Sequence, residues 1–160
     1  DTLRYPAGKL HEDEFTTYLA VYRAGKVAVT REPLYAYYQN PVGIMLSKWT
    51  PKKLHILEAT ENQIAFAREN GNQRLLKKAV RQYIYSTYEQ IGFAKQWDNP
   101  GRGRLLKTMR KKLRDGLRQG KEFDLFPLCR ELFWVYEEAY PMKPFWWLYG
   151  KLGRREERQE

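Results

Sequence analysis

The sequence predicts a mainly α-helical protein that begins with a small α/β portion. Apolar residues recur at helical spacing from Thr50 onward, and two short runs rich in valine and tyrosine precede that point. The 42% hydrophobic and 15% aromatic residues exclude a disordered chain, because such content can bury enough surface to offset chain entropy. We expect the α/β portion over residues 1–46 and a helical bundle over residues 47–160.

The α/β portion is expected to hold one helix and two strands. Apolar side chains three and four positions apart predict a helix from about Glu12 to Ala24. Valine and tyrosine favour strands, which we expect over Lys26–Thr30 and Leu34–Gln39, on either side of a break at Pro33.

Four further helices are expected in the bundle. A proline at a first helical position, a glycine after a last turn and an asparagine before a first turn are typical helix boundaries. These signals place the helices at about Pro51 to Gly71, Asn72 to Gly92, Arg104 to Arg118 and Pro127 to Tyr140.

Cysteine content and hydropathy indicate in which cellular compartment the protein is expected. The single cysteine, Cys129, has no internal partner, which favours a reducing compartment. No apolar run approaches the ~20 residues that cross a bilayer. We therefore expect a cytoplasmic protein. The first residue is Asp1 rather than methionine, which suggests a piece of a longer protein.

Three consecutive carboxylates, Glu12, Asp13 and Glu14, stand where the first helix should begin. One interpretation is purely structural, because acidic residues stabilise helix N-termini by meeting exposed N–H groups and the positive end of the dipole. The other is chemical, because an ionised carboxylate in that place can accept a proton from a hydroxyl group.

A longer pattern favours the chemical interpretation. The segment Tyr5–Phe15 has the sequence YPAGKLHEDEF, and after the helix and a valine-rich run Glu32–Gln39 has the sequence EPLYAYYQ. This order resembles the bacterial family 2 glycosyltransferases over about residues 3–46. The resemblance implies a C-terminal remnant of a GT-A-type domain, inverting transfer of a sugar from a nucleotide sugar to a hydroxyl acceptor, and a role in cell-envelope or surface polysaccharide synthesis.

The resemblance also implies roles for single residues. Asp13 matches the catalytic base, and Glu12 matches the acid that would orient the acceptor or the base. His11 lies beside the motif, where it would contact acceptor or diphosphate, and Gln39 keeps a family position expected to bind substrate. Both arginines that flank this glutamine in many members are replaced here, by Tyr38 and by asparagine.

The family's other half is not in this sequence. That half binds the nucleotide sugar, and its Asp-x-Asp group holds a divalent metal, Mg²⁺ or Mn²⁺, whereas this chain contains no Asp-x-Asp. The resemblance therefore implies that the nucleotide-binding half lies upstream, that the donor and a glycan or lipid-linked acceptor bind the complete enzyme, and that this chain alone is inactive.

The net charge of +10 is concentrated in one segment. Nine basic residues and one carboxylate, Asp115, lie between Gly101 and Lys121, so this stretch carries +8. Three interpretations are open: a solvated helix face, an anionic membrane surface, or nucleic acid, which no recognisable motif supports.

Near its C-terminus the chain has an aromatic tail, Phe145, Trp146, Trp147 and Tyr149. This tail favours a membrane over nucleic acid, since Trp and Tyr prefer the headgroup region. The expected membrane contacts, which would make the protein peripheral at the inner face of the plasma membrane, are Lys111, Arg114, Trp146 and Trp147. The same rings could instead dock onto the protein itself. The alternative function is a non-catalytic helical module that binds an anionic membrane surface or a protein partner.

Overall fold

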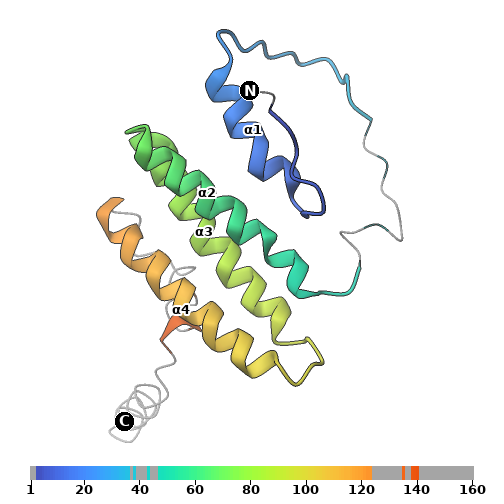
Figure 1. The fold of residues 1–160 in the computed structure, drawn as a ribbon, viewed down its shortest axis with the longest axis vertical. Coiled ribbons are helices and arrows are strands. Elements are labelled where there is room, and N and C mark those ends of the chain that lie inside the picture. Colours follow the sequence, from blue (N-terminus) through green and yellow to red (C-terminus); the bar gives the residue numbers. More distant parts are fainter. Residues whose placement is uncertain are drawn as a thin grey trace, which may run out of the picture.

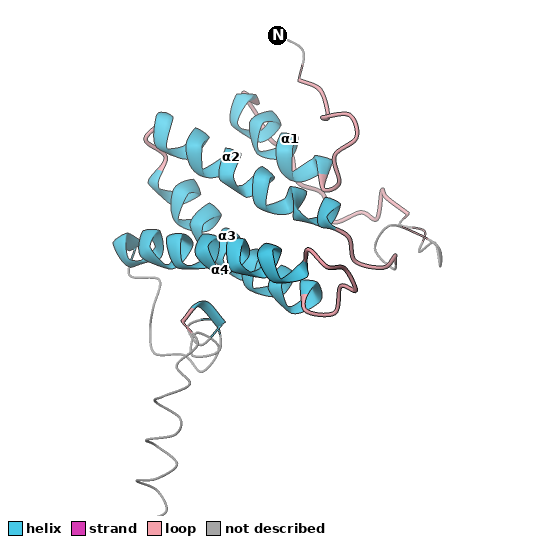
Figure 2. Ribbon diagram, turned by 60° about the horizontal axis from the view of Figure 1, so that its bottom comes forward, coloured by secondary structure: helices cyan, strands magenta, loops and turns pink. Residues whose placement is uncertain are grey.

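The computed structural model describes residues 3–36, 38, 43, 47–123, 135 and 138–140, and these contain helices and loops but no strand (Figure 2). Three long helices lie side by side and α1 lies on the outer side of α2 (Figure 1). The elements in chain order are α1 (Glu12–Arg23), η2 (Pro51–Leu54), α2 (His55–Glu69), α3 (Gln73–Ala94), α4 (Arg102–Gly120) and η3 (Lys121–Phe123).

The link between α2 and α3 follows from local sequence. Gly71 has φ +62°, and the amides of Gly71 and Asn72 donate to the carbonyls of Arg68 and Ala67, which closes α2 with a Schellman motif. The Asn72 side chain then accepts a hydrogen bond from the Leu75 amide and begins α3. So short a link forces α2 and α3 to run antiparallel. The predicted boundary at residues 71–72 is confirmed.

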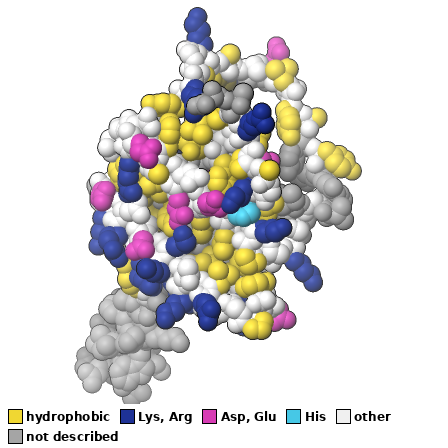
Figure 3. Space-filling model, viewed as in Figure 1, with side chains coloured by type: hydrophobic (Ala, Val, Ile, Leu, Met, Phe, Trp, Pro, Cys, Tyr) yellow, Lys and Arg dark blue, Asp and Glu magenta, His cyan; other side chains and the backbone are white. Residues whose placement is uncertain are grey.

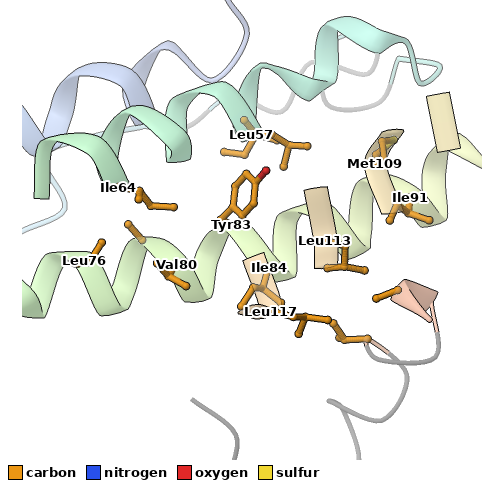
Figure 4. Packing of buried hydrophobic residues seen from close by; sticks show 14 of the residues in the cluster. Leu57, Ile64, Leu76, Val80, Tyr83, Ile84, Ile91, Met109, Leu113 and Leu117 are labelled. Atoms are coloured by element: carbon orange, nitrogen blue, oxygen red, sulfur yellow. The ribbon is translucent and has the colours of Figure 1, made fainter. Parts of the chain in front are cut away.

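The core is centred on α3, which packs against α2 on one side and α4 on the other. The apolar faces of all three helices meet there (Figure 4). Because each fully buried Leu, Ile or Met contributes roughly 1.5–3 kcal/mol, this cluster is the main source of stability. Its buried members include Leu57, Ile64, Val80, Tyr83, Ile84, Ile91, Met109, Leu113 and Leu117.

The first helix is held by aromatic contacts with α2. The Phe66 ring lies edge-on to Tyr18 and Tyr22, with centroids 5.2 and 4.9 Å apart, and the Tyr22 hydroxyl donates to Asn70 Oδ1. The predicted helix near residues 12–24 is confirmed.

The predicted strands, and with them the α/β part of the predicted fold class, are wrong within the described residues. Residues 26–36 run as extended chain outside any sheet, with Val29 91% and Tyr35 81% exposed. A valine-rich run becomes a strand only when a neighbouring strand pairs with its backbone and a packed layer covers one face. The described part of the chain supplies neither a pairing strand nor a covering layer. It is therefore all-helical, and the predicted GT-A remnant with a helix and short strands is not present in it.

The third bundle helix is longer than predicted, since α4 begins at Arg102 and ends at Gly120. The predicted helix from Pro127 to Tyr140 lies mostly outside the described residues. Of its described residues, Val135 and Ala139 are buried in the core.

Gly116 of α4 packs directly against α3. A Cβ atom there would lie 3.0 Å from Tyr83 Cδ1 and 3.2 Å from Ile84 Cγ1. We expect Gly116→Val to lower the free energy of unfolding by about 1–3 kcal/mol, because the branched side chain forces α4 away from α3. Urea unfolding followed by circular dichroism measures this change.

The matched control is Gly92→Ala, at an exposed position in α3 where a Cβ meets nothing within 4 Å. It should raise stability by about 0.5–1 kcal/mol through helix propensity alone. A Gly116→Val variant as stable as the original protein would contradict the close-packing interpretation.

Candidate functional site

The acidic start of α1 follows a left-handed residue. His11 has φ 59° and ψ 40°, and it is the one non-glycine residue with positive φ in the part of the chain that the structure describes. Such a conformation costs of order 1–3 kcal/mol and persists where the surroundings hold it in place. The His11 carbonyl accepts the Glu14 amide at 3.1 Å, so the turn leads directly into the helix.

Contacts with α2 hold this turn. The Lys9 ammonium lies 2.6 Å from a carboxylate oxygen of Glu58, and the Leu10 amide donates to His55 Nδ1 at 3.0 Å. The bundle therefore positions the segment that carries the candidate site.

The three carboxylates have different surroundings. The buried Gln63 side chain donates to both the Glu14 carboxylate and the Glu14 carbonyl, at 3.0 and 2.8 Å, so Glu14 serves to join α1 to α2. Glu12 and Asp13 are exposed, and no ion pair engages either of them among the described residues. Asp13 Oδ1 accepts the Glu14 amide at 3.0 Å.

The structure brings His11, Glu12 and Asp13 together at the N-terminus of α1, with His11 partly buried. Gln39 lies outside the described residues, so its distance from this group stays a prediction. Glu12 and Asp13 thus both offer exposed carboxylates to a hydroxyl group, and no described residue is hydrogen-bonded to Asp13 Oδ2.

The two predicted membrane contacts on α4 differ. Lys111 is exposed, whereas Arg114 is partly buried and donates to the Ala139 carbonyl at 3.0 Å, with its guanidinium 5.9 Å from the centre of the Tyr140 ring. Arg114 is thus engaged in internal contacts. Trp146 and Trp147 lie outside the described residues.

A polar cleft that the sequence did not predict lies between α2 and α4, and Tyr83 of α3 also lines it. Its volume is about 340 Å³, and Arg68, Asp115 and Gln119 are among the residues that line it. Glu61 accepts hydrogen bonds there from the Tyr83 hydroxyl at 2.8 Å and from Lys112 at 2.5 Å. These residues come from three helices, so no linear spacing could have grouped them.

Burial raises the pKa of Tyr83 far above its ordinary value, and the hydrogen bond to the negative Glu61 raises it further. The neutral phenol, 4% exposed, therefore acts as a fixed donor that ties α3 to α2.

No group of three histidine, cysteine or acidic side chains that could hold a metal ion occurs in the described ranges. The residues described here therefore do not fit the divalent metal that the resemblance implies, and the ligands of that metal stay a prediction about the complete enzyme. Of the helices that the structure describes, none has both the length and the apolar character that crossing a membrane requires.

Comparison with known proteins adds no relative. No family model, no curated protein and no solved structure matches the chain significantly.

The role of Tyr83 predicts a pH dependence. Above about pH 10 the unfolded chain releases the Tyr83 proton while the folded protein keeps it, so the free energy of unfolding falls with rising pH by about 1.4 kcal/mol per unit. Tyr83→Phe should cost about 1 kcal/mol at neutral pH and should lack this part of the fall. Urea unfolding of both proteins between pH 8 and about pH 11.5 measures the difference.

Tyr5→Phe is the control, because Tyr5 is 63% exposed and its removal should leave the alkaline slope unchanged. Parallel slopes for the original protein and Tyr83→Phe would show that Tyr83 is not held protonated by its surroundings.

Proposed function

We propose that this chain is the acceptor-side portion of an inverting glycosyltransferase, with Asp13 as the base that activates a hydroxyl acceptor. The motif order from Tyr5 to Gln39 carries the proposal. The surroundings of the acids support it, since Glu14 is used to join two helices while Asp13 faces solvent.

Asp13 has one role for each oxygen. Oδ1 accepts the Glu14 amide, which limits rotation of the carboxylate, and Oδ2 takes the proton of the acceptor hydroxyl. As that proton leaves, the acceptor oxygen forms a bond to the anomeric carbon of the donor sugar. The bond from that carbon to the nucleotide diphosphate breaks on the opposite face, which inverts the configuration.

The neighbouring residues orient the reactants. Glu12, exposed beside Asp13, accepts hydrogen bonds from further acceptor hydroxyls, and His11 donates to the acceptor or the donor diphosphate. The nucleotide sugar and its metal bind an upstream half. The described residues do not fit that metal.

The proposed setting is the cytoplasm, the reducing compartment that suits a chain with one cysteine. Nucleotide sugars are the donors there, and the products are cell-envelope or surface polysaccharides.

Asp13→Asn tests the base. The natural protein that contains this chain is incubated with a cell-envelope extract and a panel of UDP-, GDP- and dTDP-sugars, and release of the nucleoside diphosphate is measured. We expect the variant to lose about 10²- to 10⁴-fold in rate, because the amide cannot take a proton. Asparagine can still accept the Glu14 amide, so stability should change by less than about 1 kcal/mol.

Glu89→Gln is the matched control, since it removes an exposed carboxylate from α3, outside the motif that carries the proposal. It should retain the original rate. Full activity of Asp13→Asn would overturn the assignment of the base, and an unmodified protein that releases nucleotide from no donor in the panel would overturn the function.

A further inference from the structure

Seven of the eight basic residues of α4 fall into two groups that the sequence alone does not separate, and the eighth, Arg102, donates to the carbonyls of Lys95 and Trp97. One group is engaged inside the protein. Arg110 forms an ion pair with Glu138 at 2.9 Å, Lys112 one with Glu61 at 2.5 Å, and Arg114 donates to the Ala139 carbonyl. These cations hold α2 and residues 138–139 against α4.

The other group forms a row on the outside. Its four members are exposed and recur at spacings of three, four and seven residues, which place them on one face of a helix. We call this row the basic stripe. It runs from residue 104 to residue 118, a length of about 21 Å at a rise of 1.5 Å per residue. The basic stripe consists of Arg104, Lys107, Lys111 and Arg118, of which Arg118 also forms a solvent-exposed ion pair with Asp115 of the same helix, at 3.3 Å.

The opposite face of α4 fixes the orientation of the basic stripe. Met109, Leu113 and Leu117 are each no more than 1% exposed and pack into the core against α3. The helix therefore cannot rotate, and the cations form a rigid outward row. In Figure 3, lysine and arginine side chains (dark blue) gather over the part of the molecule where Figure 1 draws α4.

Carboxylates lie along both sides of the row. Asp115 and Glu61 line the cleft toward α2, and Glu138 lies on the other side, held by Arg110 and Lys95. A nucleic-acid strand that follows a groove needs cations on its walls and aromatic rings for its bases. A flat anionic surface, by contrast, contacts the row alone and leaves the flanking carboxylates in water.

We propose that the basic stripe is a binding site for the surface of an anionic phospholipid bilayer, with α4 lying parallel to the bilayer plane. This inference does not depend on the proposed transferase activity. Tyr140, 44% exposed and stacked near Arg114, flanks the row with a side chain that suits the headgroup region. No apolar side chain of α4 is exposed, so binding is electrostatic.

Sedimentation with vesicles tests the proposal. The 160-residue chain is mixed at 50 mM NaCl with vesicles of 30% phosphatidylglycerol in phosphatidylcholine. Each cation near such a surface contributes about fivefold, equivalent to about 1 kcal/mol. The variant with Arg104, Lys107, Lys111 and Arg118 changed to Gln should therefore bind at least about 100-fold more weakly. Because salt screens exposed charges, binding of the original chain should be lost at 500 mM NaCl.

The control removes the same charge elsewhere, at four exposed cations in the first turns of α3. These are Arg74, Lys77, Lys78 and Arg81, each changed to Gln. This variant should keep its affinity within about threefold, because its cations lie away from the proposed contact. Circular dichroism of both variants should match the original chain, since all eight residues are exposed.

Three results would overturn the proposal. Equal weakening by both variants would show that only net charge matters. Undiminished binding to pure phosphatidylcholine would show that lipid charge is irrelevant. Retention of a 30-nucleotide DNA at 150 mM NaCl without vesicle binding, lost on changing the basic stripe, would assign the row to nucleic acid instead.

Discussion

The burial of α3 between α2 and α4 is the constraint on which the rest of the structure depends. Its apolar side chains meet both neighbours, and Gly116 lets α4 approach Tyr83 and Ile84 within van der Waals contact. Because close packing restricts rotation of each helix, every polar residue on α2 or α4 takes a definite direction. The cleft at Glu61 and the outward row on α4 are consequences of that packing.

The candidate active site depends on the same bundle, because α2 holds the segment that carries it. The segment that carries the proposed transferase motif ends before residue 47, yet Lys9, Leu10 and Glu14 are held by side chains of α2. A motif of consecutive acids thus becomes one structural carboxylate and two exposed ones. The difference is due to Gln63, which donates hydrogen bonds to Glu14 at the interface of α1 and α2, whereas Asp13 stays exposed to solvent.

Local signals predicted much of the fold because caps act over a few residues. The Asn72 side chain caps α3 and Gly71 adopts the positive φ that ends α2, so both boundaries follow from single residues. The buried face of α4 follows from the helical spacing of its apolar residues. Strand signals are weaker, because a strand exists only with a partner. Val27 and Val29 have high strand propensity, but they are exposed on extended chain in the described structure.

The sequence by itself determined the α2–α3 boundary, the amphipathic character of α4 and the acidic start of α1, since each depends on neighbours within one or two helical turns. The tertiary structure alone decided which charges are engaged. Lys111 and Arg114 are both basic residues of the same helix, but Arg114 donates to the Ala139 carbonyl and Lys111 is exposed to solvent. The physical reason is that the contacts of Lys112 and Arg114 join residues 51 and 25 positions apart, a separation over which side-chain periodicity carries no information.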